Sequence, residues 1–223
     1  QQKAGAAAVP GWVLEGDINA ARGEWEAALA SYRAAQQRGE NSEIVVRLHR
    51  SLSMLGKTDE AQRLSNEWLK KSPSDPALLR YMGTAALQRK DYAAAARLYR
   101  QALVGNSDNV EILNNLALAQ WQLNQRQDAL ARAEQALALA PADADVLDTL
   151  GWMLNESGQR SRSLLLLQRA ALLKATDPQI QFHLARVLLA DKQPEAAKSR
   201  LESALRLGDF PEREEAGRLL KTL

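Results

Sequence analysis

The feature that most constrains this chain is a helix-start signal that recurs every 34 residues. The five residues that share this spacing are Asn41, Asp75, Asn109, Asp143 and Asp177. Each lies just ahead of an apolar-periodic run, and each residue type accepts hydrogen bonds from the free N–H groups at a helix start. Two of them are followed by proline, which suits the first helical position because its missing N–H costs nothing there. The spacing therefore predicts a series of helical units of equal length.

Small residues recur with nearly the same period inside these units. One set, expected in each second helix, is Ala28, Ala61, Ala95, Ala129, Ser163 and Ala197. Another set, expected in each first helix and small except for His49, is Gly16, His49, Gly83, Ala117, Gly151 and Ala185. Between the two helices of each unit lies a turn signal, centred on Gly23, Gly56, Lys90, Asn124, Gly158 and Lys192. Each unit is predicted to be a helix, a tight turn and a second helix, with Gly151 making room for its neighbour.

Composition narrows the function classes. The 223 residues include 29 Lys plus Arg and 27 Asp plus Glu, so the formal net charge is only +2, which favours neither nucleic acid nor an anionic membrane. The absence of cysteine excludes disulfides, thiolate metal sites and a cysteine nucleophile. No apolar run approaches the roughly 20 residues that span a bilayer. Because the chain begins at Gln1, we expect it to be part of a longer or processed protein.

These residues resemble the tetratricopeptide repeat (TPR), most closely in "LLRYMGTAALQRKDYAAAARLYRQAL" (Leu78 to Leu103). The resemblance implies an all-α, right-handed α-solenoid in one domain over residues 1–223. The six expected units and the capping helix span about residues 9–41, 42–75, 76–109, 110–143, 144–177, 178–210 and 211–222. A polar capping helix is what an open-ended stack of repeats needs.

In this architecture the first helices form the inner wall, so a groove along them is the expected binding surface. Positions two, five, nine and twelve of each first helix are predicted to face it. The candidate groove residues are Arg50, Arg80, Asn114, Trp121, Asp148, Trp152, Phe182 and Arg186. Its aromatic residues favour the anchoring of a peptide or protein segment. Alternatively, Trp121 and Trp152 only pack between neighbouring repeats.

The sequence gives no sign of catalysis, and no cofactor or metal is predicted. It contains no H-E-x-x-H motif, phosphate loop or nucleophile elbow, and a lone histidine such as His49 or His183 is usually a packed or surface residue. Capping and the helix dipole explain the acidic residues near Asp143. The Lys, Asn and Arg pattern with which some TPR proteins hold a C-terminal carboxylate is not matched, and nucleic-acid binding lacks a basic cluster.

The segment from about 110 to 223 resembles the C-terminal end of bacterial TPR lipoproteins of PEP-CTERM/exosortase systems, through "VLDTLGWMLNESG" and "AKSRLESALRLGDFPEREEAGRLLKTL". This resemblance implies a periplasmic or outer-membrane-associated scaffold in exopolysaccharide or surface-protein export. Residues and resemblance together predict a non-catalytic scaffold that binds a protein or peptide partner. A second interpretation is a regulatory or substrate-recruiting domain of a larger enzyme. A third is that the units stack into a structural arm or self-associate through the open N-terminal end.

Overall fold

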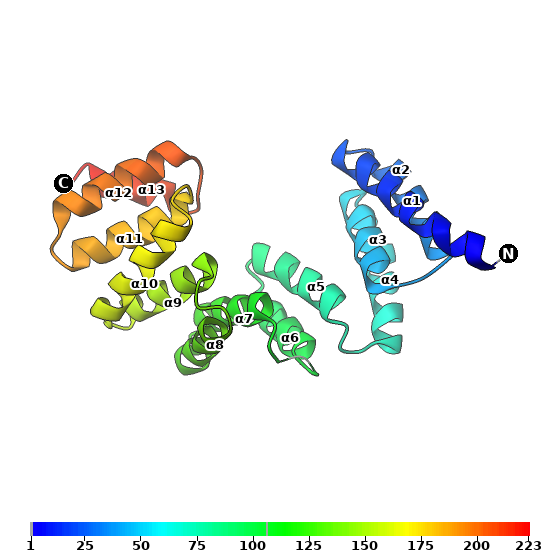
Figure 1. Ribbon diagram of the computed structural model, residues 1–223, viewed down its shortest axis with the longest axis horizontal. Helices are drawn as coiled ribbons and strands as arrows, with labels where there is room; N and C mark the ends of the chain where they lie inside the picture. The colour runs from blue at the N-terminus through cyan, green and yellow to red at the C-terminus, as the bar shows by residue number, and fades with distance from the viewer. Residues whose placement is uncertain (1, 106) are drawn as a thin grey trace. The chain divides into compact units, whose positions relative to one another are not determined.

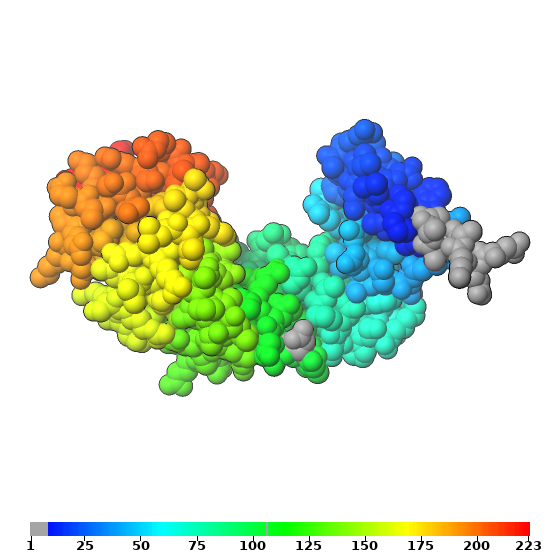
Figure 2. All heavy atoms as spheres, in the orientation of Figure 1, coloured from blue at the N-terminus to red at the C-terminus, as the bar shows by residue number. Residues whose placement is uncertain are grey.

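The computed structural model describes the backbone of residues 2–105 and 107–223 and the side chains of residues 9–105 and 107–223, shown as coloured spheres in Figure 2. Within these ranges the chain forms thirteen helices and no strand (Figure 1). The helices are α1 (Gln2–Ala21), α2 (Trp25–Gln36), α3 (Ser42–Met54), α4 (Thr58–Lys71), α5 (Pro76–Gln88), α6 (Tyr92–Ala102), α7 (Val110–Gln122), α8 (Arg126–Leu139), α9 (Ala144–Glu156), α10 (Arg160–Leu173), α11 (Pro178–Ala190), α12 (Pro194–Leu207) and α13 (Arg213–Leu220). The predicted all-α solenoid class is confirmed.

All five predicted capping residues cap a first helix. The Asn41, Asp75 and Asn109 side chains accept a hydrogen bond from the backbone N–H three residues later, at 2.9 to 3.0 Å. Asp143 and Asp177 each accept two such bonds, from the residues two and three positions later. These bonds satisfy donors that have no partner within the helix, so each capping residue fixes the start of its helix.

The six hairpin turns share one backbone conformation. The central residue of each turn has a positive φ, from 60° to 78°, and these residues are Gly23, Gly56, Lys90, Asn124, Gly158 and Lys192. Glycine adopts this left-handed conformation freely, whereas Lys and Asn adopt it at a cost. Each turn has three residues between its two helices, so the hairpin corner is the same in every repeat.

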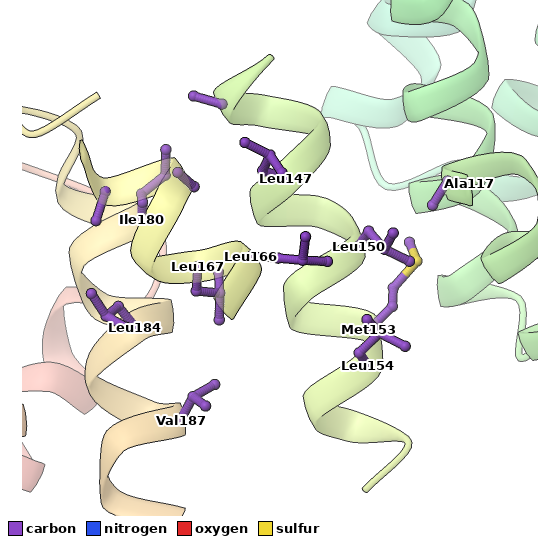
Figure 3. Close-up of a cluster of buried hydrophobic side chains, with 14 of the residues drawn as sticks. Ala117, Leu147, Leu150, Met153, Leu154, Leu166, Leu167, Ile180, Leu184 and Val187 are labelled. Carbon is purple, nitrogen blue, oxygen red and sulfur yellow. The ribbon is translucent and has the colours of Figure 1, made fainter. Parts of the chain in front are cut away.

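The chain divides into two compact units, residues 1–106 and 107–223. The core of the first unit includes Leu29, Tyr32, Ile44 and Leu48, all less than 5% exposed. The larger core of the second unit joins α7, α9, α10 and α11, and Figure 3 shows its leucine, methionine and isoleucine side chains pointing toward one another. The single-domain organisation of residues 1–223 stays a prediction.

Gly151 makes room for α10, as its place in the repeat predicts. A Cβ atom there would lie 2.8 Å from Cγ of Leu167, closer than packed carbon atoms approach. The Ser163 hydroxyl, also from α10, donates a buried hydrogen bond of 2.6 Å to the carbonyl oxygen of Gly151. Gly16 and Gly83 play the same part in the first unit, where the rings of Tyr32 and Tyr99 lie against them. The small-residue positions thus set the distance between the two helices of a repeat.

The two ends of the chain differ slightly from expectation. Helix α1 begins at Gln2 rather than near Val9, because the alanine-rich residues 4–8 are good helix formers. The capping helix α13 is shorter than predicted, and it buries Ala216 against a cluster with Phe182 and Phe210 while its charged residues stay outside. No helix in the described part of the chain is long and apolar enough to cross a membrane.

Candidate binding pocket

The second unit has a pocket of about 630 Å³ that is walled by three successive first helices. Helices α7, α9 and α11 and their capping residues supply its entire lining, and the second helices α8, α10 and α12 supply none. Side chains that line it include Glu111, Asn114, Asn115, Leu118, Asp145, Asp148, Trp152, Gln179 and His183. The repeat architecture itself therefore creates the pocket.

One wall of the pocket is built by a buried ion pair and a stacked indole. Nδ1 of His183 lies 2.8 and 2.9 Å from the two carboxylate oxygens of Asp148. The ring of Trp152 stacks on the His183 imidazole with 4.4 Å between centroids and 20° between planes. The His183 side chain is only 7% exposed, whereas Trp152 is half-buried. Asp148 holds the imidazole in place, and the imidazole positions the indole at the pocket surface.

The charge on this imidazole depends on Asp148. Burial alone would lower the pKa of His183, but the charge of Asp148 and its hydrogen bond raise this pKa by more. The charges of Glu212 and Asp177 raise it further. The pKa of His183 is therefore raised above its ordinary 6.5. The extra stability from this ionisation is fully present below pH 6.5 and is lost as the pH rises through the folded-state pKa.

We expect Asp148→Asn to lower the pKa of His183, because the substitution removes the attractive charge and leaves the burial unchanged. An NMR titration of the imidazole in both proteins measures the difference. The free energy of unfolding of the wild type should fall with pH above 6.5, and that of the variant should fall less. An unchanged pKa in the variant would show that Asp148 does not stabilise the charged imidazole.

Asn114 brings an unsatisfied polar group to the same pocket. It is 8% exposed, and its amide oxygen is buried with no hydrogen-bond partner among the described residues. A buried acceptor without a partner is costly, typically by about 1–3 kcal/mol. Such a group is unusual in a folded protein, so its place in a pocket marks a position where a ligand donor would be stabilised.

The first unit has a separate pocket of about 820 Å³, lined mainly by α1, α3 and α5. In it the Arg47 guanidinium donates to both carboxylate oxygens of Asp17, at 2.9 and 3.3 Å, and the Tyr32 hydroxyl donates to the same carboxylate at 2.7 Å. Burial would raise the pKa of Asp17, but these hydrogen bonds and the Arg47 charge lower it. Arg50 lies 5.8 Å from the centre of the Trp25 ring. In this pocket Asp17, Arg47 and Tyr32 therefore satisfy one another.

The predicted groove residues fall into three groups. Asn114, Asp148 and Trp152 meet in the pocket of the second unit, and Arg186 lies beside them, 5.6 Å from the Trp152 ring and ion-paired with Glu215.

By contrast, Trp121 and Phe182 are core residues, 6% and 1% exposed. Trp121 packs in the main core of the second unit, and the Arg126 guanidinium covers its ring at 3.8 Å, so it does not line the pocket. For Trp121 the structure favours the packing alternative. Arg50 lines the pocket of the first unit, and the half-buried Arg80 lines neither pocket.

Sequence reasoning missed His183 and Arg47, which are both the sixth residue of a first helix. His183 contacts Trp152, the ninth residue of the preceding first helix. Arg47 binds Asp17, which follows Gly16 as Trp152 follows Gly151. The repeated contact between position nine and the next position six could have been found by aligning the repeats, which would have placed position six at the binding surface.

No group of three or more His, Cys, Asp or Glu side chains in the described part of the chain is placed to hold a metal ion. The chemistry available in the pocket is hydrogen bonding, ion pairing and aromatic contact, which are the interactions of recognition.

Comparison with known proteins agrees with this architecture. Two tetratricopeptide repeat profiles match residues 50–110 and 86–153. The human cell division cycle protein 16 homolog is 25% identical over 154 residues, which cover 65% of this chain, and its mouse counterpart matches equally. The chain spans about a quarter of the length of these curated proteins.

Solved structures show the same fold at low sequence identity. One chain of the Cut9–Hcn1 hetero-tetramer of the APC/C superposes with a TM-score of 0.75 at 17% identity, over 96% of this chain and 42% of that one. A thermophilic TPR protein from Thermus thermophilus superposes with a TM-score of 0.64 at 21% identity, over 81% of this chain and 100% of that one. YrrB, described as a TPR protein with an unusual peptide-binding site, superposes with a TM-score of 0.62 at 17% identity, over 86% of this chain and 97% of that one. The chain thus has an all-α repeat fold, and its residues 50–153 match the tetratricopeptide repeat, a type of repeat that generally mediates protein–protein interactions.

Proposed function

We propose that this chain is a non-catalytic scaffold that binds a segment of a partner protein against the first helices of its second unit. The observation that carries the proposal is the pocket walled by α7, α9 and α11, in which a half-buried indole and an unsatisfied amide stand together. Aromatic anchors beside a few polar groups are typical of sites that hold a peptide. YrrB is a TPR protein with a peptide-binding site, and Cut9 and Hcn1 form a hetero-tetramer, so both similar structures support the same class of function.

The test is position-specific photo-crosslinking in the cells that make this protein. A benzoylphenylalanine at Asn115, which is half-buried and lines the pocket, is expected to form an adduct with one segment of one partner. The control is the same group at Leu165, which is 65% exposed on the second helix α10. Mass spectrometry identifies the segment. Equal adducts from both positions, or none from Asn115, would refute segment binding in this pocket.

Residues 110–223 resemble PEP-CTERM system lipoproteins, and this resemblance suggests a cellular compartment and a process for the protein. We propose on that basis that the partner belongs to bacterial exopolysaccharide or surface-protein export. The identity of the crosslinked protein tests this separately. A partner outside such machinery would overturn the export role and leave the binding function standing.

A further inference from the structure

We infer that the pocket of the second unit takes a lysine- or arginine-bearing stretch of an extended polypeptide. The inference rests on the proposed function and specifies the chemistry of the segment. Charge, an unsatisfied acceptor and an aromatic surface each contribute to it.

The first contribution is the charge of the lining. Five carboxylates line the pocket, from Glu111, Asp143, Asp145, Asp148 and Asp177, and its lining residues include no lysine or arginine. The chain as a whole has a net charge of +2, so this acidic lining is a local feature. Asp143 and Asp177 also cap helices, Asp145 pairs with Lys174 at 2.6 Å, and Asp148 pairs with His183 at 2.8 Å. Glu111 and Asp145 are the most exposed of the five, so they are the carboxylates that a cationic side chain meets first.

The second contribution is the amide oxygen of Asn114. It accepts no hydrogen bond from the described residues, although it belongs to a side chain that lines the pocket. An oxygen of this kind calls for a donor, and the ammonium and guanidinium groups of lysine and arginine are donors without acceptors. The amide oxygen is therefore compatible with the class of ligand that the carboxylates favour.

The third contribution is Trp152, whose half-buried indole lines the pocket. The face of an indole attracts a lysine or arginine side chain more strongly than do the other aromatic rings, and Arg186 of this chain already lies 5.6 Å from the centre of the Trp152 ring. The indole is held in place by its stack on His183, so little conformational entropy is lost when a ligand contacts it. An acidic segment would be repelled by this lining and would gain nothing from the ring.

The test uses the full chain and two fluorescein-labelled peptides of equal length, one alternating lysine with serine and one alternating glutamate with serine. Fluorescence anisotropy is expected to show that the lysine peptide binds at least about tenfold more tightly. Its affinity should fall as salt is added, because salt screens exposed charges. The variant Glu111→Gln with Asp145→Asn should weaken binding of the lysine peptide about five- to tenfold.

The matched control is Asp128→Asn with Glu156→Gln. This pair removes the same two charges from exposed positions of the second unit that do not line the pocket. It should leave the affinity for the lysine peptide nearly unchanged. An equal loss in both double variants would show that net charge rather than the pocket attracts the peptide, and would overturn the inference.

A second pair of variants separates the acceptor from general packing. Asn114 and Gln120 both lie on α7, and both have a buried amide oxygen without a partner among the described residues, but only Asn114 lines the pocket. Asn114→Leu is expected to weaken binding of the lysine peptide about fivefold, whereas Gln120→Met should not change it. Similar affinities in both variants would remove Asn114 from the site.

Other outcomes are equally decisive. Equal affinity for the two peptides, or binding of neither, refutes the basic-segment inference, while adducts from Asn115 in cells would still support segment binding. Competition by spermidine at the affinity of the lysine peptide would assign the pocket to a free polyamine and overturn the peptide assignment.

Discussion

Replacing Trp121 with alanine is expected to lower the free energy of unfolding by about 3–5 kcal/mol. The side chain is 6% exposed and packs in the main core of the second unit, so its removal leaves a large cavity between α7 and its neighbours. The Arg126 guanidinium also loses the ring that it covers at 3.8 Å. Urea unfolding followed by circular dichroism measures the change.

Trp152→Ala is the matched control, since it removes the same side chain from the equivalent helix of the next repeat. Its indole is half-buried and lines the pocket, so we expect a loss of only about 1–2 kcal/mol, mainly from the stack on His183. The same variant should weaken binding of the lysine peptide. Equal destabilisation by the two variants would contradict the distinction between a core indole and a pocket indole.

The second large effect is expected from Gly151→Ala, which should lower the free energy of unfolding by about 1–3 kcal/mol. The new methyl group would lie 2.8 Å from Cγ of Leu167 and 3.2 Å from its Cδ2, so α10 must move away from α9. That movement also strains the buried hydrogen bond from Ser163 to the Gly151 carbonyl oxygen. Thermal and urea unfolding should both report the loss.

Gly217→Ala provides the control for helix propensity. Gly217 lies inside α13, and a Cβ atom there would meet nothing within 4 Å. This substitution should raise the free energy of unfolding by about 0.5–1 kcal/mol, because alanine favours the helix over glycine. If Gly151→Ala is as well tolerated as Gly217→Ala, the close approach of α9 and α10 does not depend on glycine.

The fold was largely predictable because local signals recur and agree with one another. Asn109 caps α7 and Asp143 caps α9 because short oxygen-bearing side chains satisfy free N–H groups wherever a helix starts, whatever surrounds it. Gly151 could be assigned from its place among small residues at the same repeat position. Such signals depend on a few neighbouring residues, so a single sequence carries them.

The candidate site was only partly predictable because it depends on contacts between repeats. Asn114 and Asp148 were placed at the surface of the first helices, but Trp121 and Trp152 could not be told apart by residue type. Their different surroundings follow from position, since Trp121 is the twelfth residue of α7 and Trp152 the ninth of α9. His183 was passed over because its partner lies 35 residues away on another helix.

Because the hairpin turn is the same in every repeat, the chain can change its length more easily at some places than at others. Every hairpin turn has three residues, whereas the links between repeats range from four residues (72–75) to seven (103–109). One residue added within a hairpin would change the three-residue turn that pairs the two helices, and one added inside a helix would rotate the residues beyond it by about 100°. The links between repeats already differ in length, so they accept added residues more readily. Insertions and deletions should therefore accumulate in the links between repeats rather than in the hairpin turns. The two paired helices of a repeat would then be inherited as one unit.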